Sequence, residues 1–92
     1  MAERSVPIED LLEFPTPFEF KAVGPNQEAF VAAVEATARD ALGASRTLER
    51  RTRTSRNGTY LSVTLSTRVE NADELRAVYA GLRTVPGVIT VL

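Results

Sequence analysis

Apolar residues recur along this chain with two periods, and the change from one period to the other divides it into predicted strands and helices. Between Phe18 and Val23 apolar and polar positions alternate, which is typical of a strand with one buried face. After the Gly-Pro-Asn break at 24–26 the period lengthens to three and four residues, which predicts an amphipathic helix. The apolar stripe of this helix comprises Phe30, Val31, Val34, Ala38 and Leu42.

Local signals mark both ends of this helix. Asn26 is of a residue type that caps helix N-termini, and Gly43 suits the backbone conformation that often follows a last helical turn. The sequence therefore predicts a strand, a turn and one helix between Phe18 and Gly43.

The middle of the chain has the pattern of a hairpin. Residues 46–54 are rich in threonine and arginine with Leu48 as their one apolar residue, which is typical of a solvent-exposed edge strand. The Asn57-Gly58 pair that follows is a strong turn signal. Residues 60–69 then alternate with period two, with Thr67 as the polar exception on the apolar face. Two antiparallel strands joined by a turn are predicted.

A second helix and a last strand complete the pattern. Asn71 or Asp73 is a candidate N-cap, and the Pro86-Gly87 pair stops the helix. The apolar stripe comprises Leu75, Val78, Tyr79 and Leu82. The β-branched run 88–92 predicts a short strand. The order of elements is therefore βαββαβ.

This order predicts an α+β fold, a ferredoxin-like two-layer sandwich. Right-handed crossovers place four antiparallel strands in the order 4-1-3-2, with both helices on one face and the other face open. Residues 1–16 are predicted to form an N-terminal arm with a short helical turn, and residues 17–92 the domain. The apolar residues of the arm either cover one end of the core or offer a patch to a partner; they are Ile8, Leu11, Leu12 and Phe14.

The composition fits one small globular domain. The chain has 92 residues, of which 43% are hydrophobic and 25% charged. No apolar run approaches the ~20 residues that a membrane span requires. Residues 1–10 carry three acids and lack the apolar segment of a leader peptide. We therefore expect a cytoplasmic protein with no membrane partner.

The residue types argue against catalysis. The chain contains no cysteine and no histidine, on which acid-base catalysis and transition-metal binding most often depend. Adjacent carboxylates occur at 9–10 and 73–74, and helix capping explains the second pair better than catalysis does. Lys21, the only lysine, lies on a predicted strand and is typical of a solvated side chain. We expect neither an enzyme nor a bound metal or cofactor.

Two features are candidate ligand sites. Gly24 and Asn26 precede a helix N-terminus, where free N–H groups and the helix dipole favour an anion, although the same residues also suit a simple turn and cap. Tyr60 is predicted on the open sheet face, where RNA-recognition domains stack bases. The face continues with Ser62 and Thr64 and has no second aromatic, so nucleic acid is disfavoured.

A third candidate is a group of arginines in the predicted hairpin. The group comprises Arg46, Arg50, Arg51, Arg53 and Arg56, offset locally by Glu49. Guanidinium groups bind carboxylates and phosphates with two parallel hydrogen bonds, so an acidic partner would fit the last four of them. The same charges would also protect an edge strand from aggregation or pair with the acidic arm.

The opening of the domain matches a known family. The matching residues are Leu11-Leu12-Glu13-Phe14-Pro15-Thr16-Pro17-Phe18, Phe20-Lys21, Val23-Gly24, Gly58-Thr59-Tyr60, Ser62-Val63 and Val91-Leu92. Over about residues 8–92 the chain resembles the YbeD-like family of small bacterial proteins. The resemblance implies a ferredoxin-like fold similar to amino-acid-binding regulatory domains, and a lipoic-acid-binding regulatory role. It supplies no catalytic residue and no counterpart for the segment 50–56.

Three functions remain open. The leading hypothesis is a regulatory module that senses a small acidic metabolite or docks on a metabolic enzyme, through the Gly24 turn or the open face around Tyr60. The alternative is a binder of nucleic acid or an acidic protein that uses the arginine hairpin 46–56. A structural dimerisation domain would instead use an exposed edge such as 88–92, and both monomer and homodimer remain open.

Overall fold

A computed structural model describes residues 11–92 of the chain. Its elements follow the predicted order βαββαβ. They are β1 (Thr16–Pro25), α2 (Glu28–Leu42), β2 (Glu49–Thr54), β3 (Tyr60–Val69), α3 (Ala72–Leu82) and β4 (Thr90–Val91). Among the helices of residues 11–92, none has the length and apolar character needed to cross a membrane.

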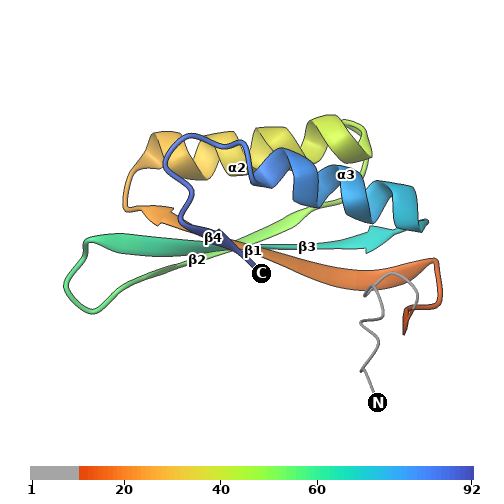
Figure 1. The fold of residues 1–92 in the computed structure, drawn as a ribbon, viewed down its shortest axis with the longest axis horizontal. Helices are drawn as coiled ribbons and strands as arrows, with labels where there is room; N and C mark the ends of the chain where they lie inside the picture. Colours follow the sequence, from red (N-terminus) through yellow and green to blue (C-terminus); the bar gives the residue numbers. More distant parts are fainter. Residues whose placement is uncertain (1–10) are drawn as a thin grey trace, which may run out of the picture.

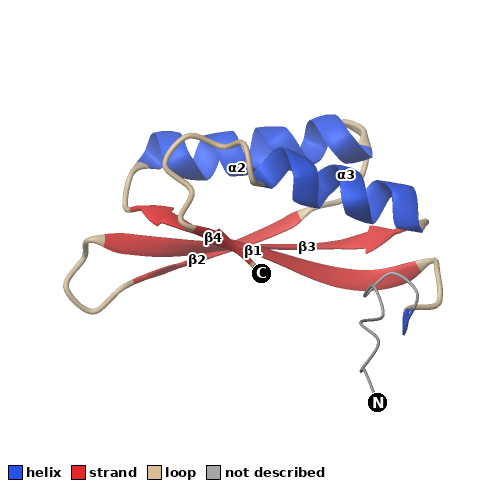
Figure 2. Cartoon of the chain, in the orientation of Figure 1, coloured by secondary structure: helices blue, strands red, loops and turns tan. Residues whose placement is uncertain are grey.

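The four strands form one antiparallel sheet in the order β2-β3-β1-β4. Helices α2 and α3 lie side by side on one face of this sheet, and no helix or strand of residues 11–92 covers the opposite face (Figure 1). Figure 2 shows the same two layers, with the helices in blue above the strands in red. The predicted ferredoxin-like topology is confirmed, including the edge position of the arginine-rich strand.

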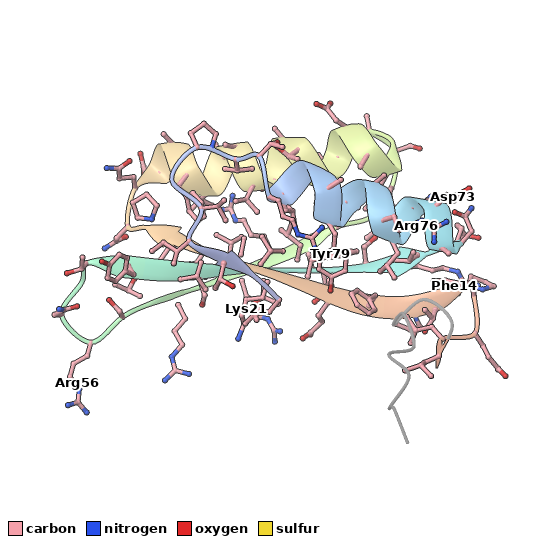
Figure 3. All side chains as sticks on the ribbon, in the orientation of Figure 1. Phe14, Lys21, Arg56, Asp73, Arg76 and Tyr79 are labelled. Carbon is pink, nitrogen blue, oxygen red and sulfur yellow. The ribbon has the colours of Figure 1, made fainter. Side chains whose placement is uncertain are left out.

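The strand register decides which side chains face the helices. Phe20 pairs with Leu65, and Ala22 pairs with Val63; all four are fully buried between the sheet and the helices. The helices contribute the other side of this core with Phe30, Val34, Ala38, Leu42, Leu75, Val78 and Leu82. The positions in between, such as Lys21, face the open side (Figure 3).

An aromatic cluster joins α3 to the sheet. The ring centroids of Phe18 and Phe20 are 4.9 Å apart, and that of Tyr79 is 6.2 Å from the first and 5.2 Å from the second. Tyr79 meets both phenylalanines edge-on, which is a favourable geometry for aromatic pairs. Burial raises the pKa of the Tyr79 phenol, and the Arg83 guanidinium lies 5.5 Å from its ring centroid.

Two of the three predicted helix caps are confirmed. Gly43 follows α2 with φ 101°, and the Asn71 side chain accepts a hydrogen bond from the Glu74 N–H at the start of α3. The prediction that Asn26 caps α2 is wrong, because Gln27 occupies the cap position and its side chain makes no capping bond. Asn26 instead donates its side-chain amide to the Gly58 carbonyl.

Several strand boundaries differ from the prediction. β1 begins at Thr16 instead of Phe18, because Thr16 and Pro17 pair with the end of β3, and the last strand spans only Thr90–Val91 of the predicted 88–92. β1 continues through Gly24 and Pro25, because the long strand β3 offers Leu61 and Tyr60 as ladder partners there. The second strand was expected from residue 46 but begins at Glu49. Residues 46–48 are joined to β3 by side-chain hydrogen bonds instead of a backbone ladder. For example, the Thr67 hydroxyl donates to the Thr47 carbonyl at 2.7 Å.

The predicted N-terminal arm is described only from residue 11 onward. Leu12 and Phe14 pack against the core, whereas Leu11 is 69% exposed. The rest of the predicted helical turn, including Ile8, lies outside the described residues. The described end of the arm therefore covers part of the core.

Candidate functional site

The three residues predicted to bind a ligand meet at one end of the sheet, beside the β2–β3 hairpin. Tyr60 pairs with Pro25 at the last position of the β1–β3 ladder. Asn26 then crosses to the hairpin: its backbone N–H donates to the Thr59 carbonyl at 3.2 Å, and its side-chain amide donates to the Gly58 carbonyl at 2.9 Å. The link between β1 and α2 is thus tied to the hairpin loop.

These residues nevertheless belong to opposite faces of the sheet. Gly24 pairs with Leu61, and both positions face the helices. Tyr60 occupies the alternate position and is 47% exposed. A ligand that contacts Asn26 on the helix side would therefore be separated from Tyr60 by the sheet itself.

Gly24 has a packing role that the sequence did not reveal. A Cβ at this position would lie 2.4–2.8 Å from three atoms of the Phe30 ring. Such distances are far inside van der Waals contact, and the ring itself is buried. Glycine is required here because the first turn of α2 seats Phe30 directly on the backbone of β1.

A groove on the helix side brings together residues that the sequence had placed in two separate candidates. It has a volume of about 370 Å³ and lies between the first turn of α2 and strand β2. Asn26 and Arg50 both line it, although they are 24 positions apart in the chain. The groove also has apolar walls, formed by Val31, Ala32 and Leu61.

Within residues 11–92, the charged groups at this groove are one cation, Arg50, and two acids, Glu28 and Glu35. The Arg50 guanidinium donates to Glu35 at 2.9 Å and is 48% exposed, so a second acceptor can reach it. The side chain at the cap of α2 makes no capping bond, which leaves first-turn N–H groups for a ligand oxygen. Glu28 lines the same groove and adds one negative charge. A carboxylate held by Arg50 with its apolar part on Val31 would satisfy these groups.

A second, smaller hollow lies on the open face. It has a volume of about 180 Å³ and is lined by Tyr60 together with Val23, Arg53 and Ser62. Arg51, two positions before Arg53, also faces this side and donates to Glu19 at 2.9 Å. Arg56 projects from the tip of the hairpin, away from the helices (Figure 3). The hairpin arginines are thus divided, with Arg50 on the helix side, Arg51 and Arg53 on the open side and Arg56 at the tip.

Arg46 is removed from this group by a structural ion pair. Its guanidinium donates to both carboxylate oxygens of Glu74, at 2.9 and 2.7 Å, and to the Arg68 carbonyl at 2.8 Å. Both paired side chains are about four-fifths buried. The hydrogen bond from Arg46 lowers the pKa of the Glu74 carboxyl. Arg46 therefore joins the α2–β2 loop to the start of α3.

The Arg46–Glu74 pair gives the fold a pH dependence. Glu74→Gln is expected to lower the free energy of unfolding by about 1–2 kcal/mol at pH 7. The folded pKa of Glu74 lies below the unfolded value of about 4.3, so this stability is present above pH 4.3 and is lost as the pH falls through the folded pKa. In urea unfolding followed by circular dichroism, the difference between wild type and variant should shrink below about pH 4.

Glu19→Gln is the matched control for that experiment. It removes the same charge from a pair with Arg51 in which both side chains are more than half exposed. Its effect should stay below about 0.5 kcal/mol. An effect of Glu74→Gln that did not change between pH 7 and pH 3 would contradict the assigned role of the ion pair.

Another hollow lies at the other end of the sheet and was not predicted. Its volume is about 780 Å³, and its lining includes two acids, Glu19 and Glu49, beside Arg46 and Arg68. These residues come from β1, β2, β3 and the loop after α2, so no local sequence signal unites them. Its mixed charges do not single out one class of ligand.

Comparisons with known proteins agree with this fold. A family model described as "Protein of unknown function (DUF493)" matches residues 9–92. A curated UPF0250 protein from Haemophilus ducreyi is 36% identical over 85 residues, which cover 92% of this chain and 86% of that protein. The solution structure of an H. pylori protein matches with a TM-score of 0.75 and 14% identity over 98% of both chains.

Two further solved structures share the architecture. The ACT domain of a GTP pyrophosphokinase from Chlorobium tepidum matches with a TM-score of 0.59 and 19% identity, over 83% of this chain and 94% of that one. A Thermotoga maritima protein gives 0.60 and 16%, over 83% and 92%. These likenesses show the fold alone, an ACT-like member of the ferredoxin-like class. The resemblance of the opening residues to YbeD-like proteins is confirmed, and with a match over residues 9–92 the chain belongs to the DUF493 family.

Proposed function

We propose that this protein is a non-enzymatic regulatory module of the cytoplasm that binds a small carboxylate in the groove between α2 and β2. The observation that carries this proposal is the meeting of Arg50 and Asn26 in one hollow beside the first turn of α2. A guanidinium and free helix N–H groups are complementary to a carboxylate. The volume of about 370 Å³ falls within the usual range for small-molecule sites.

The walls of the groove favour a ligand with an apolar part. Val31, Ala32 and Leu61 provide apolar contact, and the threonines at 52 and 54 provide hydroxyl groups. A medium-chain acid such as octanoate or lipoate presents one carboxylate and one apolar chain. These acids also agree with the lipoate-related role that the family resemblance implies. We therefore take octanoate and lipoate as the first probes.

The tie between the groove and the hairpin supports a regulatory role. Asn26 lines the groove and holds the hairpin through two hydrogen bonds, to Gly58 and to Thr59. The Asn26 amide group has two N–H donors, so a ligand oxygen could accept from one while the other still donates to the Gly58 carbonyl. Binding would thereby link the ligand to the hairpin, which a metabolic enzyme could contact. The ACT-like fold of the chain is compatible with such a module.

Arg50→Gln tests the proposal, with Arg51→Gln as its matched control. The two arginines are adjacent on β2 and face opposite sides of the sheet. In titrations followed by amide chemical shifts, Arg50→Gln should weaken octanoate or lipoate binding about ten-fold or more, because a hydrogen bond to a charged group contributes about 1.5–3 kcal/mol. Arg51→Gln should bind like the wild type.

Octanamide provides the second control. It keeps the apolar chain and removes the charge, so it should bind much more weakly than octanoate if the carboxylate is recognised. Equal binding of octanamide, or equal losses in both arginine variants, would contradict a carboxylate site in this groove. If octanoate, lipoate and octanamide all leave the amide chemical shifts of Asn26, Val31 and Thr52 unchanged, none of them is a ligand of this groove.

A further inference from the structure

The open face of the sheet carries a concentration of positive charge at its hairpin half. Lys21 and Arg51 flank Thr64 from the two neighbouring strands, and Arg53 lies two positions along β2 beside Ser62. Arg56 adds a fourth cation at the hairpin tip. Figure 3 shows Lys21 and Arg56 both projecting to the side away from the helices. No helix covers these side chains (Figure 1).

These four cations are largely free of internal partners. Of the four, only Arg51 forms an ion pair within residues 11–92, with Glu19 at 2.9 Å. Glu19 and Glu49 lie in the row beyond Arg51, on the side away from the hairpin, so strands β1, β2 and β3 place no acidic side chain on the hairpin half of the face. Without the four cations the net charge of the chain would be −5 instead of −1. The positive charge is thus segregated onto one part of an otherwise acidic molecule.

The surface between the cations is made of short hydroxyl side chains. Strand β3 places Ser62, Thr64 and Ser66 in a line along the open face, between the longer side chains of β1 and β2. Ser62 and Ser66 are partly exposed, whereas Thr64 between them is buried. At the hairpin end this line reaches the 180 Å³ hollow beside Tyr60 and Arg53. Hydroxyl groups accept and donate hydrogen bonds, and the flanking cations favour carboxylates. An extended chain with acids at alternate positions is complementary to this arrangement.

The charge distribution favours an acidic protein segment over a nucleic acid. A nucleic acid carries its charge along its whole length and would extend from the four cations onto acidic regions of the molecule. The face also presents a single aromatic ring, Tyr60, where single-strand binders usually stack several bases. A protein segment can confine its acids to the length of the patch. The patch therefore matches a short acidic stretch of polypeptide.

We infer that the hairpin half of the open face, with Lys21, Arg51 and Arg53 around the hydroxyls of β3, is a docking surface for an acidic segment of a partner protein. This surface is distinct from the carboxylate groove, because the two lie on opposite faces of the sheet. Arg50 faces the groove and takes no part in the docking surface.

The test uses a labelled octapeptide of alternating glutamate and serine, with its glutamine–serine counterpart and an eight-nucleotide oligothymidylate as comparisons. Fluorescence anisotropy at low ionic strength should show that the full chain binds the glutamate peptide more tightly than either comparison. Amide chemical shifts should change at Lys21, Arg51 and Thr64. Affinity should fall as salt is raised, because the charges involved are exposed.

Two triple variants with the same net charge separate docking from general attraction. Lys21→Gln, Arg51→Gln and Arg53→Gln together should weaken the glutamate peptide about ten-fold or more. Arg39→Gln, Arg76→Gln and Arg83→Gln remove three cations from the helix side. Compared at about 0.15 M salt, where the Debye length is about 8 Å, this control should leave the affinity within about two-fold of wild type. Thermal melts of both variants establish that they remain folded.

Several outcomes would overturn the inference. They are equal losses in the two triple variants, tighter binding of the oligothymidylate than of the glutamate peptide, chemical shifts confined to the helix side, or no binding of the glutamate peptide at low salt. Arg50→Gln distinguishes this surface from the carboxylate groove, because it should leave the peptide affinity unchanged whatever it does to octanoate.

Discussion

Phe20→Ala is expected to lower the free energy of unfolding by about 3–5 kcal/mol, the largest effect of any change considered for this chain. Phe20 is fully buried, and its ring is in contact distance of Phe18 and edge-on to Tyr79. Truncation leaves a cavity at the centre of β1, where the sheet meets α3. Since small domains have a total stability of about 5–15 kcal/mol, the variant should be close to unfolded at 37 °C. Urea unfolding followed by circular dichroism measures the loss.

Phe18→Ala is the matched control, because it removes the same ring from the same strand and the same face. Phe18 is only half-buried, so less apolar surface returns to water and the cavity opens to solvent. Its loss should be about half that of Phe20→Ala or less. Similar losses at both positions would mean that the aromatic cluster, and not the core beneath α2 and α3, limits stability.

Gly24→Ala is expected to lower the free energy of unfolding by about 2–3 kcal/mol, the range of a clash in a well-packed core. The added Cβ would lie 2.4 Å from the Phe30 ring, and the ring is too buried to move aside freely. The cause is packing, because no positive φ is involved at this glycine. Chemical denaturation of the variant beside wild type gives the magnitude.

The double variant Gly24→Ala with Phe30→Leu tests that cause. Leucine is narrower than the phenyl ring, so the second change should recover part of the loss, and the two effects should be less than additive. If the losses in unfolding free energy of the two single variants simply add, a clash with the Phe30 ring is not the cause of the Gly24→Ala loss. The clash would also displace the first turn of α2, which lines the carboxylate groove. The ligand affinity of Gly24→Ala therefore has to be compared with the ligand affinity of the double variant.

Most of the fold follows from periodicity because the core is built from regular patterns. Leu61, Val63 and Leu65 alternate along β3 and all face the helices. The stripe of α2 is equally regular, so the predicted helix and the observed one agree within one or two residues. The missed cap has a tertiary cause. Asn26 was a good local candidate, but the hairpin offered its amide a carbonyl 32 positions away.

The candidate sites were less predictable than the fold. Apolar alternation shows which face of β3 is buried. Residues 49–54 are all exposed and have no such alternation, so no pattern assigns Arg50 and Arg51 to the two faces of the sheet. The groove depends on that assignment, because only Arg50 reaches the first turn of α2. The role of Gly24 depends on where the Phe30 ring lies. Both facts arise from contacts between elements, which local pattern does not encode.

The two proposed surfaces lie on opposite faces of the same strand, β2. Alternate residues of β2 face a groove suited to a small acid and a plane suited to an acidic polypeptide. The hairpin that carries both is held by Asn26, which lines the groove. A metabolite bound on one side could thus influence docking on the other through the hairpin, without contact between the two ligands. Peptide titrations in the presence and absence of octanoate measure that coupling.

The exposure of β2 has a consequence for how its alignment in the sheet is specified. A strand normally keeps its register because a slip of one residue would expose its apolar face, but this strand has no apolar face to lose. Its alignment is set instead by the turn that joins it to β3, where the Ser55 N–H donates to the Tyr60 carbonyl and the Gly58 N–H to the Ser55 carbonyl. In this register Arg50 meets Glu35 on the helix side and Arg51 meets Glu19 on the open side. A single-residue shift of β2 at this turn would exchange the two arginines between faces while leaving the composition of the edge almost unchanged. Length variation in the turn after β2 is therefore a route by which related chains could gain or lose either surface without altering their core.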